Sequence, residues 1–539
     1  MKRLLVFSLM IATGAGAALP AATVPLDHWA YEVADELVIR GLWTAERFGE
    51  RPWSRADFAA GAGYLLEQYE RGEVGLHPAS RGWLDRLVEE FAPEIERWRS
   101  DRGPASRADY AARDEPPEPA LEVGARLEAS AGYRSAELQL PEDGAEGEDA
   151  PAEPESGLRD RERLELLFGG GYGDELALWG RAEADTDGLE DSDWRGLDWK
   201  AGISAQFDYG FLRWRPTEWF QAWAGRDQLQ WGYSIGGSLL FSGTAPAPDG
   251  FGYGLEWGPL RFSYFHCALD TWREGPESDY TYYNRFLVGH RLSWQAAPWL
   301  VVGLGEATTY GGEGRGIDLA YLNQLMLHYV EQLAGRVHND NPFWQLDVDV
   351  LPFPGGRFWG QLMIDDYQYE DDPEPPHIGF LAGAAWADPL NLAGLTLSLE
   401  YLKVWNWVYN VKPDYDKLLY LGHPLGFPRG NDADRWSFRL NWDFGADWST
   451  RFAVTLDRKG EGRIEDEWEA KGFTSEPFPS GVVEELQTYA LSGAWHPNRN
   501  LEVGLELALR RATNYANLEG AELTDIYAGL SASYLLDWR

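Results

Sequence analysis

The sequence predicts an all-β transmembrane barrel of about 18 antiparallel strands that follows a small N-terminal α-helical module. Apolar and polar residues alternate with period two from residue 121 onward, and the connections between these segments alternate between short and long. Beyond the first residues, no apolar run approaches the roughly 18 residues that a membrane helix needs. Aromatic residues make up 14% of the chain, with 27 Trp, which is rich for a polar secreted domain. A soluble secreted all-β enzyme is the alternative fold class.

The first residues predict export. Lys2 and Arg3 precede a short apolar run, and Ala15-Gly16-Ala17 has the small residues of a cleavage site, so residues 1–18 are expected to be a secretory signal peptide. The chain has one cysteine, Cys267, which excludes an intramolecular disulfide framework and a cysteine metal site. The formal net charge of −40 excludes nucleic acid as an unaided electrostatic partner.

Residues 24–102 predict a helical module. The stretch "PLDHWAYEVADELVIRGLW" has apolar residues at helical spacing, with Asp27 as the expected N-cap and Gly41 as the stop. Ser54 is the expected cap of a second helix, and one further helix is expected from about Ser80. A Pro/Ala/acidic linker, residues 103–120, leads to the barrel, residues 121–539.

The barrel segments are about ten residues long and carry charges on one face, as in "LTLSLEY" and "RWSFRLNWDF". A soluble sandwich also alternates, but its strands are usually shorter. The expected strands start near residues 121, 161, 174, 204, 218, 251, 260, 285, 299, 343, 357, 378, 395, 434, 451, 486, 500 and 523.

The connections give an independent test of the barrel. Each even-to-odd connection is a tight turn, such as "RPT", "WGP" or "HPNR", whereas the odd-to-even connections are mostly long. A single-chain outer-membrane barrel has short periplasmic turns and long extracellular loops. An even strand number therefore places the helical module in the periplasm, and the module or the long loops could fill the lumen.

One motif suggests catalysis. Gly232-Tyr-Ser-Ile-Gly236 matches the Gly-x-Ser-x-Gly pattern of a hydrolase nucleophile elbow around Ser234. An elbow requires a helix after the serine, and "GSLLFSGTAPAPDG" contains no helical span. Asp365 and Asp366 point to opposite faces of a strand, so they cannot share one substrate. The chain is therefore expected not to be an enzyme.

No cofactor is expected, with a structural Ca²⁺ as the one possibility. The nine histidines are scattered without metal-site spacing. The oxygen-rich loops "HNDNP" and "GNDADR" make Asp340, Asp432 and Asp434 weak Ca²⁺ candidates, although such turns are also ordinary loop chemistry.

The long loops are expected to carry exposed aromatic rings beside amides and charges, a pattern that suits sugars because rings stack on C–H faces and polar groups bind hydroxyls. The alternative is that the rings mark the outer aromatic girdle and pack loop against loop. The glycan-binding candidates are Arg226, Asp227, Trp231, Tyr233, Tyr283, Asn284, Trp405, Asn406, Trp407 and Tyr409.

Several stretches resemble the Wzi-type capsule assembly family, among them "AGRDQLQWGYSIGGSLLFSGTAPAPDGF", "DNPFWQLDVDV" and "LSLEYLKVWNWVYN…YLGHPLGFPRGNDADR". The resemblance implies an 18-stranded outer-membrane lectin with a periplasmic helical bundle that binds capsular polysaccharide. The N-terminal stretch also resembles one S-layer-homology repeat, with Ser54-Arg-Ala-Asp57 in place of Thr-Arg-Ala-Glu.

We therefore expect a non-enzymatic outer-membrane barrel that binds surface polysaccharide and supports its attachment or assembly. Its expected partners are the polysaccharide, outer-membrane lipid and, through the helical module, the periplasm or the export machinery. Because the chain is acidic, a neutral glycan or one bridged by divalent cations is expected. The alternatives are an outer-membrane porin anchored through its helical module and an outer-membrane hydrolase.

Overall fold

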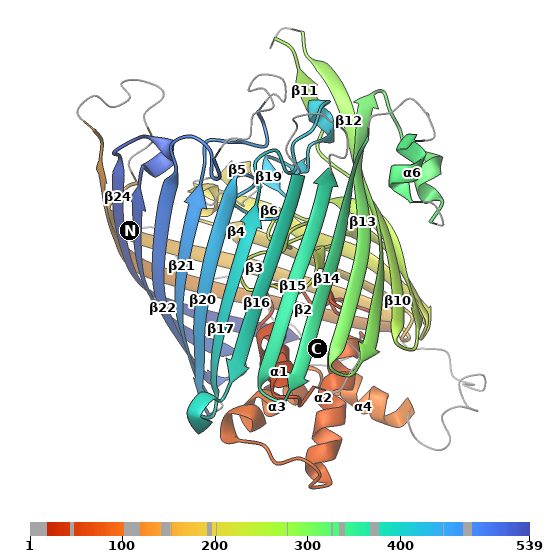
Figure 1. Ribbon diagram of the computed structural model, residues 1–539. Coiled ribbons are helices and arrows are strands. Elements are labelled where there is room, and N and C mark those ends of the chain that lie inside the picture. Colours follow the sequence, from red (N-terminus) through yellow and green to blue (C-terminus); the bar gives the residue numbers. More distant parts are fainter. Residues whose placement is uncertain are drawn as a thin grey trace.

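The computed structural model describes residues 19–43, 48–101, 119–141, 151, 154–190, 197–200, 202–276, 279–324, 327–333, 340–366, 377–445, 447–466 and 477–538. The predicted signal peptide and most of the predicted linker lie outside these residues. The described chain forms a closed antiparallel barrel of 18 strands with a group of helices at one end (Figure 1).

The barrel strands follow one another in chain order, and the last strand pairs with the first along its full length. They are β2 (Pro119–Gln139), β3 (Gly157–Tyr172), β4 (Leu176–Asp185), β6 (Ile203–Thr217), β7 (Phe220–Arg226), β9 (Asp249–Trp257), β10 (Leu260–Ala268), β12 (Thr281–Ala297), β13 (Leu300–Glu313), β14 (Asn341–Phe353), β15 (Gly356–Asp366), β16 (His377–Ala387), β17 (Leu395–Val404), β20 (Ala433–Phe444), β21 (Trp448–Lys459), β22 (Glu484–Asn498), β23 (Leu501–Thr513) and β24 (Glu522–Trp538). Short strands β5 (Leu197–Lys200) and β11 (Trp272–Glu274) extend the wall beside β6 and β12.

The predicted strand order and connection lengths are confirmed. Every predicted strand start lies within four residues of an observed one. The short turns, from residues 173–175 to residues 499–500, all lie at one end of the barrel, called the short-turn end here. The long connections lie at the opposite, long-loop end (Figure 1).

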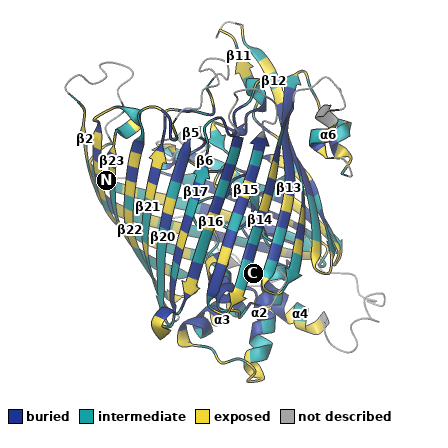
Figure 2. Ribbon diagram, in the orientation of Figure 1, coloured by how far each residue is buried: buried dark blue, intermediate teal, exposed yellow. Residues whose placement is uncertain are grey.

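The two faces of the wall differ, as alternation requires (Figure 2). The outward side chains include a band of exposed leucines, namely Leu292, Leu304, Leu346, Leu362, Leu399, Leu456, Leu491, Leu507 and Leu530. Exposed tryptophans gather near the short-turn end, including Trp214, Trp219, Trp257, Trp294, Trp299, Trp386, Trp448 and Trp495, and Trp436 is exposed nearer the long-loop end. This arrangement is the apolar band and aromatic girdle of a membrane barrel. No described helix is long and apolar enough to cross a membrane.

The helical module consists of α1 (Ala30–Ile39), α2 (Arg55–Glu70), α3 (Pro78–Glu90) and α4 (Ala92–Asp101), packed around its own apolar core. Ser54 caps α2 as predicted, in a capping box with Asp57. The single helix expected from Ser80 is two helices, because the chain turns at Phe91 just before Pro93. Asp27 is not a cap. Its carboxylate forms an ion pair with Arg181 of the wall, 2.6 Å away.

The module closes onto the short-turn end of the barrel through partly buried ion pairs. Arg40 contacts Asp388 at 2.9 Å, and Arg357 of the wall contacts Asp35 of α1 at 3.1 Å. The short strand β1 (Glu50–Arg51) pairs with β8 (Gln230–Trp231), which belongs to the connection between β7 and β9. The module and this connection therefore meet inside the barrel.

Two long connections fold into the lumen instead of projecting from it. Residues 227–248 and 405–432, the latter with η4 (Asp414–Asp416), β18 (Leu419–Tyr420) and β19 (His423–Pro424), contribute to one apolar cluster with the inner wall. The guanidinium of Arg285 donates to the backbone carbonyls of Tyr415, Lys417 and Leu419 and holds the second connection against β12. These segments fill the side of the lumen that is bounded by β7 to β20.

Candidate functional site

Four of the predicted glycan-binding aromatics lie inside the barrel, so the expectation that they are exposed loop residues is wrong. Trp231 is 3% exposed and packs edge-on against Phe241, with ring centroids 4.8 Å apart. Trp407 and Tyr409 are buried in the second inward connection. The ring of Tyr233 lies 3.3 Å from the guanidinium carbon of Arg357. Burial of these large rings stabilises the inward fold of both connections, and the sequence pattern alone does not distinguish the lumen from the outside.

Arg226 and Asp227 are adjacent in sequence but face different surroundings. Arg226 forms an ion pair with Asp249 at the rim, at 2.7 Å. Asp227 is buried, where it accepts from Arg213 at 2.8 Å and from the Thr23 hydroxyl at 3.1 Å. Its side chain therefore ties the start of the inward connection to the N-terminal segment and is not available at the surface.

The remaining candidates lie toward the long-loop end, Tyr283 and Asn284 on β12 and Trp405 and Asn406 on the β17–β20 connection. Tyr283 stacks on Tyr415 with ring centroids 4.9 Å apart, and the amide of Asn284 donates to the carbonyl of Arg315. The Trp405 ring lies 4.0 Å from Lys403 Nζ. Asn406 Oδ1 accepts from the backbone N–H of Trp407, so both of these side chains also have partners within the protein. The structure does not bring these residues into one site, and their contact with a glycan stays a prediction.

Ser234 is not placed as a nucleophile. Its hydroxyl donates to Glu400 at 3.0 Å and accepts from the N–H groups of Gly236 and Gly237. Glu400 also accepts from the indole of Trp359 at 2.7 Å and from the N–H groups of Ile235 and Gly236. A carboxylate that accepts so many donors anchors the loop, and the hydrogen bonds of the Ser234 side chain are to a carboxylate and two backbone N–H groups, with no histidine among them.

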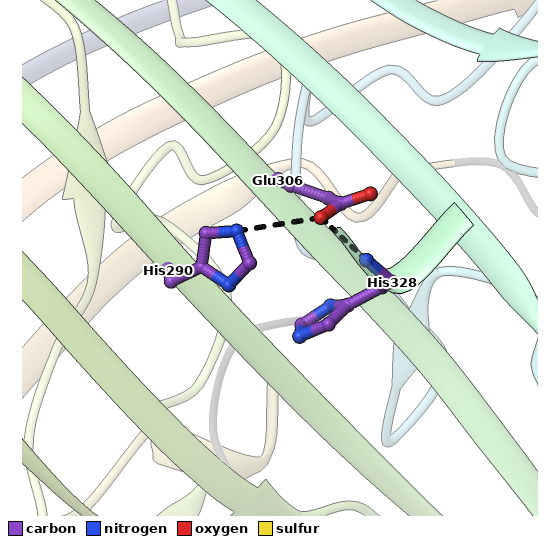
Figure 3. Close-up of side chains that lie close together, drawn as sticks. All are labelled: His290, Glu306 and His328. Carbon is purple, nitrogen blue, oxygen red and sulfur yellow. Dashed lines mark hydrogen bonds and ion pairs between the residues drawn. The ribbon is translucent and has the colours of Figure 1, made fainter. Parts of the chain in front are cut away.

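The three Ca²⁺ candidates are engaged with protein donors. Asp340 lies against Arg315, and Asp434 lies against Arg458 and the Tyr401 hydroxyl. Asp432 accepts from Gly462 N at 3.0 Å and from the hydroxyl of Ser480 at 2.6 Å, so it organises the β21–β22 connection. Among the described residues, the metal-ligating groups that gather instead are His290, Glu306 and His328 (Figure 3).

A polar cleft of about 300 Å³ opens at the long-loop end among three connections, residues 405–432, 460–483 and 514–521. We call it the loop cleft. It is lined by Pro424, Pro428, Arg429, Gly430, Asn431, Lys459, Arg463, Ile464, Glu465, Glu484, Ala516 and Asn517. The proline and isoleucine side chains provide apolar surface, while the remaining side chains supply cations, amides and carboxylates.

The polar groups of the loop cleft hold one another in position. Lys459 donates to the carbonyl of Gly462 at 2.7 Å, and Asn517 donates to the carbonyls of Lys459 and Val482. Arg429 forms an ion pair with Glu484, but its Nε is buried without a hydrogen-bond partner. Such a donor is costly to bury unpaired, although this atom is enclosed by protein and not exposed to the cleft.

Sequence reasoning missed the loop cleft because its residues are far apart in the chain. Arg429, Lys459 and Arg463 are three cations in a chain with a net charge of −40, and each lies near a predicted strand end at the long-loop side. That coincidence was the available signal. The aromatic-plus-amide pattern, by contrast, also describes rings that pack in the lumen, and it selected several of those.

Comparison with known proteins agrees with the fold. Residues 133–524 match the family described as capsule assembly protein Wzi. The structure is similar to that of Wzi from Escherichia coli, described as an outer-membrane protein involved in group 1 capsule assembly and a carbohydrate-binding β-barrel, with a TM-score of 0.58 and 15% identity over 95% of this chain and 99% of that chain.

More distant structural matches include OpdQ from Pseudomonas aeruginosa, with a TM-score of 0.42 and 12% identity over 78% of this chain and 98% of that one. A comparison with curated proteins returned no match. Because the family match spans most of the barrel, from β2 to β24, the chain belongs to the Wzi capsule assembly family of outer-membrane β-barrels.

Proposed function

We propose that this chain is a non-enzymatic outer-membrane protein that binds surface polysaccharide and supports capsule attachment or assembly, with the loop cleft as a binding site. The observation that carries the proposal is the loop cleft itself, where Arg429, Arg463, Lys459 and two amides line one opening. The similar Escherichia coli barrel is described as carbohydrate-binding, which supports the same class of ligand.

The chemistry of the loop cleft favours a sugar that carries a carboxylate or another acidic group. Arg429 and Arg463 line the loop cleft beside Lys459 and two carboxylates, so two guanidinium groups are available to an acidic sugar although the whole chain is acidic. A charge-assisted hydrogen bond contributes about 1.5 to 3 kcal/mol, more than a bond between neutral groups. The acidic chain was expected to bind a neutral glycan or one bridged by divalent cations. Direct contact with these guanidinium groups is a third way in which it could hold an anionic polymer.

The proposed orientation follows from the two ends of the barrel. The long-loop end would face the outside and the short turns the periplasm, as in single-chain outer-membrane barrels. The helical module would then lie in the periplasm, where its solvent-facing side could contact the cell wall or the export machinery. Its many ion pairs with the wall support a fixed position.

A glycan-array screen of the refolded barrel tests the proposal. We expect binding to acidic polysaccharides by the wild type and at least tenfold weaker binding by an Arg429→Ala, Arg463→Ala double variant. Arg71→Ala is the matched control, because Arg71 is an exposed arginine of the helical module. Equal binding by all three proteins would contradict the loop cleft as the site, and no glycan binding at all would contradict the function.

The porin alternative is tested with the same protein in planar bilayers. The inward connections and the module occupy the side of the lumen bounded by β7 to β20. Ion conductance together with an absence of glycan binding would favour the porin. Glycan binding that depends on the loop cleft favours our proposal whether or not a small conductance is measured.

A further inference from the structure

The β13–β14 connection covers part of the outer face of the barrel wall. It contains η2 (Leu319–Leu322) and α6 (His328–Leu333), and α6 lies outside the wall beside β13 (Figure 1). We call its described residues, 314–324 and 327–333, the outer flap. Its exposed residues include Asn323 and five large apolar side chains, Ile317, Leu319, Leu322, Leu327 and Val330. The flap therefore presents an apolar surface outward, at the side of the barrel where lipid lies.

Polar groups are enclosed between the outer flap and the wall. Arg291 of β12 points into the lumen, where it donates to the carbonyl of Gly49 in the N-terminal region. Neighbouring residues of a strand point to opposite faces, so His290 points outward. Its cross-strand partner Glu306 lies on the same outer face. His328 of the flap is 3% exposed and covers both.

These three side chains offer metal-ligating atoms that all lie within 4.8 Å of one another (Figure 3). The imidazole rings of His290 and His328 have centroids 4.6 Å apart. His290 Nε2 lies 3.3 Å from a Glu306 oxygen. The same carboxylate accepts the backbone N–H groups of His328 and Tyr329 and the Trp344 indole, at 2.7 to 3.0 Å, so it is held firmly in place.

The hydrogen bonds leave one nitrogen of each ring unused. His290 Nε2 faces a Glu306 oxygen across 3.3 Å, where one divalent ion can take the place of the proton between them, and His290 Nδ1 is buried with no partner. His328 Nδ1 lies 3.0 Å from the Thr308 hydroxyl, and His328 Nε2 is likewise buried with no partner. Histidines that bind metal usually have the second ring nitrogen held by a carboxylate or another polar group, which fixes the ring. The His328 ring has this arrangement, because the Thr308 hydroxyl holds Nδ1 and leaves Nε2 for the ion.

We propose that His290, Glu306 and His328 form a binding site for a divalent transition-metal ion of the Zn²⁺ class, which fastens the outer flap to the barrel wall. Two imidazoles with one carboxylate are a donor set that Zn²⁺ accepts, and they are not the all-oxygen set that Ca²⁺ prefers. Two ligands come from the wall and one from the flap. Binding therefore opposes movement of the flap away from the wall.

Metal binding is tested on the full-length barrel in detergent, stripped with a chelator and titrated with Zn²⁺. We expect one Zn²⁺ per chain, at least tenfold weaker binding in His328→Gln, and none in the His290→Gln, His328→Gln double variant. His77→Gln, which alters a histidine at the start of α3, is the matched control. Heat-dependent gel mobility verifies that each variant is a folded barrel.

A second measurement reads the flap directly. Chymotrypsin cleavage at Tyr321 or Leu322 should slow at least tenfold when Zn²⁺ is added to the wild type, and should not change in the folded double variant. Two results would overturn the proposal: stoichiometric Zn²⁺ binding that persists in the double variant, or wild-type binding no stronger than that of the double variant.

Discussion

Replacing Glu400 by alanine should release the inward segment 230–244 from the wall of the barrel. The buried Glu400 carboxylate is the acceptor for the N–H groups of Ile235, Gly236 and Trp359 and for the Ser234 hydroxyl. Each buried donor that loses its acceptor costs about 1 to 3 kcal/mol. Gly236 retains the Ser234 oxygen as an acceptor, and water from the adjacent cavity of about 330 Å³ can replace part of the rest.

The expected loss is therefore about 3 to 5 kcal/mol of local stability, which corresponds to an increase in local opening of about a hundredfold to a few thousandfold at about 1.4 kcal/mol per tenfold. Chymotrypsin measures this opening, because Trp231 and Phe241 are buried cleavage sites in the folded segment. When closing is fast, the cleavage rate follows the population of the open form. Glu400→Gln keeps one acceptor oxygen and should give an intermediate rate.

Glu506→Ala is the matched control, because Glu506 is an exposed carboxylate of β23. It should be cleaved at the wild-type rate. The reasoning is refuted if the folded Glu400→Ala barrel is cleaved no faster than Glu506→Ala, because the carboxylate would then not hold the segment.

Three further predictions concern other buried groups. Trp231→Ala should lower the free energy of unfolding by about 3 to 5 kcal/mol in denaturant titrations, whereas Trp219→Ala on the outer surface should have a smaller effect; equal effects would contradict a lumen core. Burial and the nearby charge of Asp340 raise the pKa of Asp416 to about 9, so the folded chain keeps a proton that the unfolded chain has lost, and stability should fall as pH rises from about 4 to 9. Asp416→Asn should flatten that dependence of the melting temperature, and an unchanged slope would assign it to other groups. Asp432→Asn keeps one acceptor for Gly462 and Ser480 and should raise trypsin cleavage after Arg463 about tenfold, with no increase expected if Asp432 does not organise the loop.

The barrel could be predicted from the sequence because two periodic signals coincide. A strand between lipid and lumen must alternate apolar and polar side chains. The connections of a chain that crosses a membrane repeatedly lie on alternate sides, so short turns alternate with long loops. The break between α3 and α4 was missed because helical spacing continues across Phe91. The Ser54 cap was found because a capping box is a local pattern.

The candidate sites were harder to predict because they depend on how connections fold. Trp231 and Tyr409 have the sequence surroundings of surface rings, but the two connections enter the lumen. His290, Glu306 and His328 have no metal-site spacing in sequence. Only the pairing of β12 with β13 and the return of the outer flap bring them together. Long-range contacts of this kind leave no local pattern.

Polysaccharide binding at the loop cleft is tested most directly by titrating the purified barrel with the capsular polysaccharide of the strain that encodes it. Our account predicts saturable binding by the wild type, at least tenfold weaker binding when Arg429 and Arg463 are both replaced by alanine, and wild-type affinity in Arg71→Ala. Binding that is absent from the wild type, or that is unchanged in the folded double variant, would contradict the account.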